Sequence, residues 1–299
     1  MIGGRVHDPV YESRSRIEAA RGRPFEVAAA GLWRCGELDA LARPCVAIVG
    51  TRAATPYGIR LAHRFASELG AAGCTIVSGL ALGIDRAARE GALAAAAPTV
   101  GVLGSGHRCF FPKRNLALAS EMVAEGGAVL SPYLPDHPAF PSQFLERNGI
   151  VAALADAVLV VEAPARSGAL NTAGWAAGQI PVLAVPGDVD RKHVAGCLAL
   201  IRDGATLARS ANDVLESLGR LPLPTLARAA PSTRDPTARA LLEAIDAGAA
   251  TFDEIVAKSG IAAAAALASL ALLELDGAVE SAGASRYSRV APLCGGEKA

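Results

Sequence analysis

The stretch Val46-Ala47-Ile48-Val49-Gly50-Thr51-Arg52 is an apolar, β-branched run that ends in a glycine and an arginine. After a helical segment, a second such run, 75–78, ends in Gly79-Leu80-Ala81-Leu82-Gly83. The carboxyl ends of neighbouring parallel strands share one edge of a sheet, and glycines there allow backbone N–H groups to approach an anion closely. The sequence therefore predicts a binding crevice at that edge, with Arg52 supplying positive charge for a phosphate-containing ligand.

Short β-branched runs alternate with longer Ala/Leu-rich amphipathic segments from Cys45 to about Ser217, which is typical of repeated βαβ units. The expected strands are 46–49, 75–78, 99–103, 128–130, 157–161 and 182–185. The expected helices are 57–71, 83–96, 113–124, 141–153 and 168–179. Because the strand runs are apolar on both faces, helices should cover the sheet on two sides. The predicted fold class is α/β, a doubly wound Rossmann-like parallel sheet.

The composition sets limits on the class of protein. The chain has 299 residues, of which 52% are hydrophobic, enough for a sizeable core. Its 29 basic and 29 acidic residues balance, so binding to nucleic acid would require a local basic patch. The six cysteines include no C-x-x-C pair, so we expect no metal site and a reducing compartment. Neither a signal peptide nor an apolar stretch long enough for a bilayer is recognisable, which indicates a cytoplasmic protein without a membrane partner.

A segment rich in proline and polar residues, 221–236, predicts an exposed linker. We expect an amino-terminal extension at 1–40, the Rossmann-like domain at 41–220, a small second domain at 237–292 and a tail at 293–299. The second domain reads as three short helices followed by two extended runs, which is the outline of a winged helix. Thr251 and Glu254 form a capping box that predicts the start of its middle helix.

The third helix of this winged helix, 262–274, consists of Ala, Leu and Ser apart from its final Glu274. Winged helices that read DNA place this helix in the major groove and need side chains that reach base edges or phosphates. No Arg, Lys, Asn or Gln is available here. The sequence therefore favours a protein-contact or regulatory role over groove binding.

A third glycine-marked strand end carries Gly104 and Gly106 and leads into Phe110 and Phe111. The basic residues Lys113 and Arg114, with Asn115, follow directly. Aromatic surface beside positive charge is the combination that single-stranded nucleic acid needs. From these residues alone, a buried role for the phenylalanines and a solvated helix start for the basic residues are equally well supported.

Two later helix starts add candidates. The first supplies Phe144, Arg147 and Asn148, which offer stacking surface, positive charge and an amide, although packing in the core explains Phe144 equally well. The second follows Ser167 and contains Thr172. Its helix amino terminus is a potential anion site, but capping alone explains Ser167 and is the favoured interpretation.

The motifs of common enzyme classes are missing from the sequence. It contains no G-x-x-x-x-G-K-[ST] phosphate loop, no H-E-x-x-H zinc site and no G-x-S-x-G nucleophile elbow. Asp85 and Glu162 lie at element ends where a general base can stand, but helix capping is the favoured role of Asp85. We therefore expect a protein that is not an enzyme and that needs no cofactor.

In this order, the motifs resemble the DNA-processing protein A family (DprA, also called Smf). The resemblance covers roughly residues 30–215 and extends to the carboxyl-terminal winged helix. The matching pieces are 46–52 with Tyr57-Gly58, 78–93, 103–106 with 111–115, Arg147-Asn148, 160–163 with Ser167-Gly168 and Thr172, and 184–187. The combination is specific, although no single motif is.

The resemblance implies a protein that binds single-stranded DNA, protects incoming strands during natural transformation, loads the recombinase RecA and forms a homodimer through its Rossmann-like domain. By motif, Arg52 matches the family's DNA-contacting arginine, and Lys113 or Arg114 falls in the segment of a second basic contact. Arg147 and Asn148 match an Arg-Asn pair beside the same pocket. The predicted nucleic-acid-binding residues are Gly50, Arg52, Gly79, Gly83, Gly104, Gly106, Lys113, Arg114, Asn115, Phe144, Arg147, Asn148, Ser167 and Thr172.

Some positions depart from the family pattern. Arg89 stands where a histidine is usual, and Gly149 stands where a second arginine is common, which removes a phosphate contact. The other departures are Pro132, Leu145 and Leu198. The stretch before Cys45 is short, so we expect the additional amino-terminal helical domain of some members to be absent or abbreviated.

Two other functions are alternatives. One is a nucleotide-processing enzyme like the nucleoside-monophosphate phosphoribohydrolases, whose Pro-Gly-Gly-x-Gly-Thr loop is not matched by residues 165–172. The other is a scaffold that has lost its crevice ligand and binds only protein.

Overall fold

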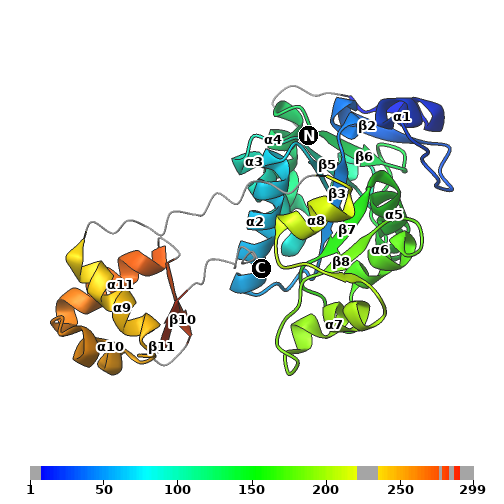
Figure 1. Cartoon of the computed structure of the whole chain (residues 1–299). Helices are drawn as coiled ribbons and strands as arrows, with labels where there is room; N and C mark the ends of the chain where they lie inside the picture. Colours follow the sequence, from blue (N-terminus) through cyan, green and yellow to red (C-terminus); the bar gives the residue numbers. More distant parts are fainter. Residues whose placement is uncertain (1–7, 221–234, 276–277, 283–285, 290–299) are drawn as a thin grey trace. The chain divides into compact units, whose positions relative to one another are not determined.

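Residues 8–220, 235–275, 278–282 and 286–289 are described in the computed structural model of the chain. They divide into two compact units, Met1–Pro222 and Leu223–Ala299 (Figure 1). The predicted linker falls largely on 221–234 and the predicted tail on 293–299, both outside the described residues.

The first unit is built on a nine-stranded sheet with the order β1-β2-β6-β5-β4-β3-β7-β8-β9. The strands are β1 (Val10–Ser13), β2 (Gly31–Gly36), β3 (Cys45–Val49), β4 (Thr75–Ser78), β5 (Thr99–Val102), β6 (Ala128–Ser131), β7 (Ala157–Val160), β8 (Val182–Ala184) and β9 (Thr206–Leu207). The strands from β6 to β9 in this order are parallel, whereas β1 and β2 are antiparallel to their neighbours. The expected α/β sheet is confirmed, and each of the six expected strands is present to within one residue at either end.

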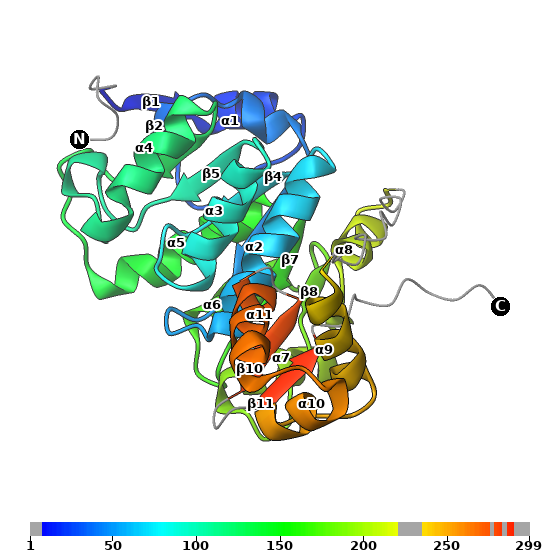
Figure 2. The same cartoon turned by 90° about the vertical axis from the view of Figure 1, so that its left-hand side faces the viewer.

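Helices cover both faces of this sheet. One face carries α2 (Pro56–Ala71), α3 (Ile84–Ala94) and α4 (Leu116–Ala124), and the other carries α5 (Pro141–Leu154) and α6 (Gly168–Ala176) (Figures 1 and 2). The strands between them are buried on both sides, and every residue of β3 and β4 is at most 4% exposed. This double burial explains why the sequence shows continuous apolar runs rather than alternation.

Helix starts follow local chemistry. Thr55 caps α2, since its side chain accepts a hydrogen bond from Gly58 N, and Pro56 fills the first helical position. The expected helix at 113–124 is divided instead into a short 3₁₀ helix, η3 (Lys113–Asn115), and α4. The sequence analysis did not identify α7 (Ala195–Arg202), α8 (Ala211–Ser217) or β9.

The structure of the amino-terminal region corrects the prediction of a separate extension at 1–40. Strands β1 and β2 pair with each other and then with β6, so residues 10–36 belong to the same sheet as the rest of the unit. Leu32 is fully buried and Cys35 is 3% exposed. Helix α1 (Arg14–Arg21) joins the two strands and buries Ile17. The short apolar run in β2 gave no βαβ signal because β2 is antiparallel to both of its neighbours and such a strand needs no crossover helix.

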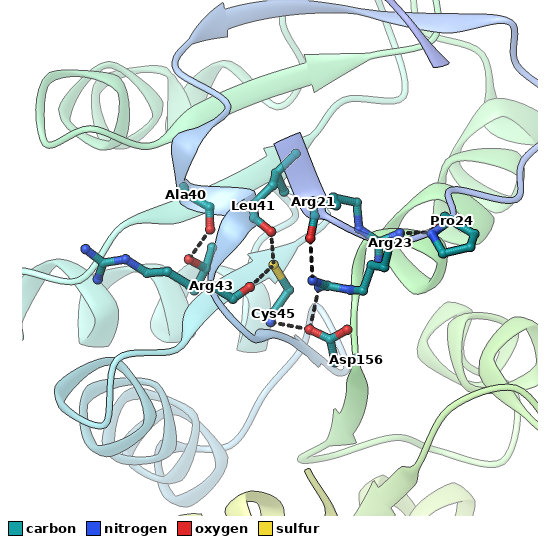
Figure 3. A network of polar contacts seen from close by, with 9 residues as sticks. Arg21, Arg23, Pro24, Ala40, Leu41, Arg43, Cys45 and Asp156 are labelled. Atoms are coloured by element: carbon teal, nitrogen blue, oxygen red, sulfur yellow. Dashed lines mark hydrogen bonds and ion pairs between the residues drawn. The ribbon is translucent and has the colours of Figure 1, made fainter. Parts of the chain in front are cut away.

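A polar network fixes this region to the amino-terminal edge of the sheet (Figure 3). Asp156, just before β7, accepts a hydrogen bond from Cys45 N at 2.7 Å and forms an ion pair with Arg23 at 2.5 Å. Arg23 also donates to the carbonyl of Arg21 at 3.1 Å, and Arg21 donates to the carbonyl of Pro24. Here Arg23 is paired with a carboxylate, whereas Arg21 bonds to a backbone carbonyl.

The second unit is the expected winged helix. It consists of α9 (Pro236–Asp246), α10 (Phe252–Ser259), α11 (Ala263–Leu275) and a hairpin of β10 (Val279–Ala282) and β11 (Arg286–Arg289). The capping box of Thr251 and Glu254 is present at the start of α10. No single helix among the described residues is long and apolar enough to cross a membrane; α10 and α11 pass that test only as a pair bent by 113°.

Candidate nucleic-acid interface

The site lies where the strand order reverses. From β3 the chain proceeds outward through β4, β5 and β6, and then returns to place β7 on the other side of β3. The loops after β3 and β7 therefore diverge to opposite faces and leave a crevice between them, which is the usual ligand position in open α/β sheets. A pocket of about 310 Å³ occupies this crevice and is lined by both loops.

Arg52 is one of two exposed arginines that line this pocket, and Arg166 is the other. Arg52 lies in the β3–α2 loop, and its guanidinium carbon is 5.4 Å from the centre of the Phe144 ring, the geometry of a cation–π contact. No carboxylate among the described residues forms an ion pair with it. Arg52 is thus free to bind an anion.

A smaller hollow of about 110 Å³ adjoins the pocket and has an apolar lining. The rings of Phe111 and Phe144 lie 5.8 Å apart at 55° to one another. Phe111 is 49% exposed, whereas Phe110 is 6% exposed and belongs to the core. Of the two phenylalanines after the third strand end, only Phe111 therefore offers a ring to a ligand.

Arg147 differs from its predicted role as an exposed phosphate contact. Its side chain is only 3% exposed, and its Nη1 donates to the carbonyls of Gly79 and Val102. Gly79 makes this possible, since a Cβ there would lie 2.6 Å from the guanidinium carbon. Burial lowers the pKa of Arg147 to about 10, so the group stays charged at neutral pH. Arg147 forms the charged floor of the pocket.

A second buried arginine, Arg89, lies behind this floor. It donates to Ser78 Oγ at 2.6 Å and to the Ala81 carbonyl at 3.1 Å, and burial lowers its pKa to about 10. The carboxylate of Asp85 opposes that decrease for Arg89 and Arg147 alike. One buried carboxylate therefore compensates the charge of two buried guanidinium groups, which leaves an excess of positive charge around them.

Asp85 also shapes the loop after β4. Its carboxylate accepts hydrogen bonds from Gly79 N at 2.9 Å and Ala81 N at 3.4 Å, so it bonds to the loop, and the cap residue of α3 is Gly83. Asn115 is fully buried and donates to the Leu80 and Ala81 carbonyls, both at 2.9 Å. Asn115 holds the pocket wall and is not exposed to a ligand.

The predicted glycines separate into two groups. Gly50 and Gly79 line the pocket, where a side chain would overlap Ile84 or Arg147. Gly83, with φ +73°, permits the turn into α3. The prediction is corrected for Gly104 and Gly106, because neither residue lines the crevice. A Cβ on Gly104 would lie 2.7 Å from the Phe144 ring, and the N–H of Gly106 donates to the His137 carbonyl.

The predicted basic residues Lys113 and Arg114 do not line the pocket. Lys113 and Arg114 are exposed in η3, directly after Pro112, which lines the smaller hollow, but they are not lining residues themselves. Arg108 forms ion pairs with Asp136 and Asp8 at 2.8 and 3.3 Å. Lys113 and Arg114 are therefore close to the hollow in sequence but do not line it.

The β7–α6 side brings three predicted residues to the pocket. Ser167 caps α6 and accepts from Ala169 N at 3.3 Å, and Asn148 donates to the Gly168 carbonyl at 3.1 Å. Thr172 lines the pocket at 2% exposure. Sequence reasoning missed the lining residues Leu82, Pro112, Leu145, Pro164 and Arg166. Pro164 and Arg166 follow the fifth predicted strand, so their position at a strand end was the available signal.

This fold and pocket define a doubly wound α/β protein with an arginine-lined pocket at its strand ends, followed by a winged helix. The family model described as DNA recombination-mediator protein A matches residues 13–219, and the DprA winged helix domain matches residues 224–284. The chain belongs to the DprA/Smf family of DNA-processing proteins.

Several relatives support this assignment. The putative DNA processing protein DprA of Mycobacterium tuberculosis is 41% identical over 273 residues, which cover 87% of this chain and 69% of the relative. Protein Smf of Escherichia coli is 40% identical over 61% of this chain and 49% of its own length.

Two solved structures are similar. The crystal structure of DprA from Streptococcus pneumoniae has a TM-score of 0.59 and 38% identity, covering 63% of this chain and 66% of that one. The structure of DprA from Helicobacter pylori, which describes a single-stranded DNA binding mode, has a TM-score of 0.60 and 29% identity, covering 71% and 94%.

Proposed function

We propose that this protein binds single-stranded DNA in the crevice between β3 and β7. The observation that carries the proposal is the unpaired Arg52 at the mouth of a pocket whose floor contains the buried charge of Arg147. One backbone phosphate would lie against Arg52 and the glycine-marked loop. A base would stack on Phe111 or Phe144, because stacking is tolerant of sequence.

Titration of labelled oligo-dT at two salt concentrations tests this proposal. Loss of one phosphate contact in Arg52→Ala should reduce the slope of log K against log salt by ~0.7, which is about a fivefold loss of affinity near 0.1 M salt. The matched control is Arg202→Ala, since Arg202 is exposed on α7 and pairs with Asp203 at 2.9 Å. Equal binding by wild type and Arg52→Ala would contradict the proposal, as would a preference for duplex DNA.

The finer function follows from the family. We propose that the protein protects incoming DNA strands in natural transformation and loads RecA on them in the cytoplasm, as a homodimer formed through the Rossmann-like domain. Light scattering of the purified chain tests the dimer. RecA filament formation on oligo-dT, followed with and without the protein, tests loading; an unchanged nucleation rate would exclude it.

The winged helix is proposed to contact protein and not DNA. Its third helix, α11, exposes Leu267 by 56% and Leu272 by 62%, and its described residues offer no cationic or amide side chain. Replacing Leu272 by Asp should therefore leave oligo-dT affinity unchanged. A loss of affinity in that variant would assign α11 to DNA binding.

We propose no reaction for the pocket. The competing enzyme function predicts release of adenine from AMP, which chromatography of an overnight incubation would detect. Adenine formation that stops in Arg52→Ala would place a hydrolase in the same crevice.

A further inference from the structure

Glu162 connects both ends of the loop that carries Arg52. It follows β7 and is 1% exposed. Its backbone carbonyl accepts a hydrogen bond from Thr51 N at 2.7 Å. Its carboxylate accepts from Thr55 N at 2.9 Å and from Thr55 Oγ1 at 2.5 Å. The residues between these two anchors are Arg52, Ala53 and Ala54.

The space for this carboxylate is built into the first turn of α2. A Cβ on Gly58 would overlap the carboxylate of Glu162, so a larger residue at that position would displace the carboxylate. The amino terminus of a helix also favours a negative charge. The Nε2 of His193, in the 3₁₀ helix η4 (Lys192–Val194), lies 3.7 Å from Oε1. The carboxylate is thus held from three elements and does not line the pocket.

We propose that Glu162 is a positioning residue for single-stranded DNA binding, acting through the loop that carries Arg52. The inference rests on the proposed function of the pocket. A charged side chain on a loop binds tightly only when the loop is already ordered, because otherwise binding must supply the ordering entropy. Glu162 supplies that order by fixing Thr51 and Thr55, while the side chain of Arg52 contacts the phosphate.

Trypsin digestion of the DNA-free protein tests the loop directly. Trypsin cleaves after arginine, and the Arg52–Ala53 bond lies in the exposed middle of the loop. In Glu162→Gln, which keeps the shape of the side chain, we expect cleavage at this bond to be about tenfold faster, corresponding to one lost charge-assisted hydrogen bond. The matched control is Glu90→Gln, whose carboxylate pairs with Arg86 on the exposed side of α3. Equal cleavage in the wild type and Glu162→Gln would overturn the proposal.

Binding to oligo-dT provides the second readout. Glu162→Gln should lower the affinity about five- to tenfold in the wild-type background. In the Arg52→Ala background the same substitution should have no further effect, because Glu162 acts only through Arg52. An equal loss in both backgrounds would show a general structural role and overturn the inference.

Failure of the proposed function gives a different pattern. If Arg52→Ala and Glu162→Gln both leave oligo-dT affinity unchanged while cleavage of the loop accelerates, Glu162 orders the loop but the DNA site is wrong. The positioning role is then overturned together with the proposed site.

If Glu162→Gln does not fold, Thr55→Val and the conservative Thr55→Ser take its place. Thr55→Val should reproduce the faster cleavage and weaker binding, and Thr55→Ser should restore both; identical behaviour of the two variants would contradict the proposal.

Discussion

The two edges of the same sheet handle charge in opposite ways. At the amino-terminal edge, Arg23 pairs with Asp156, and the same carboxylate accepts the N–H of Cys45 (Figure 3). At the carboxyl edge, Asp85 is the one buried carboxylate near Arg89 and Arg147 among the described residues, and Arg52 has no acidic partner there. The ion pair at the first edge stabilises the fold, whereas the second edge has an unpaired arginine that is available to a ligand.

Burial of an arginine lowers its pKa to a similar extent at both edges. Burial lowers the pKa of both carboxyl-edge arginines to about 10, and the pKa of Arg21 at the amino edge falls to about 10 through burial and the proximity of Arg23. All three stay protonated at neutral pH. At the carboxyl edge, an anionic ligand would provide the charge compensation that the protein itself does not.

The largest expected effect is on folding, at the carboxyl edge. Asp85→Ala removes the acceptor of Gly79 N and the carboxylate nearest two buried guanidinium groups, and should lower the free energy of unfolding by about 3–5 kcal/mol. Urea denaturation measures the loss. Glu90→Ala on the same helix is the control, since its exposed ion pair should contribute less than about 1 kcal/mol. If both variants are equally stable, the buried charges are compensated elsewhere.

The next effect is on binding. Phe111→Ala should lower oligo-dT affinity by about 1–3 kcal/mol without changing the salt slope, because a stacking contact neutralises no phosphate. Phe140→Ala is the control, since Phe140 is 50% exposed and does not line either hollow. An equal loss in both variants would remove base stacking from the site.

The amino edge should affect stability alone. In Asp156→Ala, Cys45 N and the guanidinium of Arg23 lose their acceptor, and unfolding should become easier by about 1–3 kcal/mol. Oligo-dT affinity of the folded variant should be unchanged. The contrast between the two edges would fail if this variant bound DNA as weakly as Arg52→Ala.

The smallest effect depends on pH. His107 is 3% exposed, its neutral Nε2–H donates to the Val129 carbonyl at 2.9 Å, and burial lowers its pKa below 6.5. As pH falls below ~6.5 the unfolded chain takes up a proton that folded His107 resists, so stability falls by at most about 1.4 kcal/mol per pH unit. Denaturation at two pH values should show this loss in the wild type and in His63→Gln, an exposed control on α2. In His107→Gln the loss should disappear; if it persists, another group causes it.

The fold was largely predictable because its signals are local. The apolar runs of β3 and β4, the cap at Thr251 and the glycines after each strand depend on neighbours within a few residues. Strand β2 was missed because its pairing with β6 joins residues about a hundred positions apart, and β1 joins the sheet only through β2. The sequence of a short antiparallel strand carries no pattern that predicts such a partner.

The sequence by itself determined the strand-end edge, the place of Arg52 on it and a winged helix whose third helix has no DNA-reading side chains. Only the tertiary structure decided that Arg52 is free and Arg147 is not. Both are arginines in the sequence, but Arg147 donates to the carbonyls of Gly79, after β4, and Val102, at the end of β5, while no described carboxylate pairs with Arg52. The availability of a charge depends on partners brought together by packing, and the order of residues along the chain does not specify them.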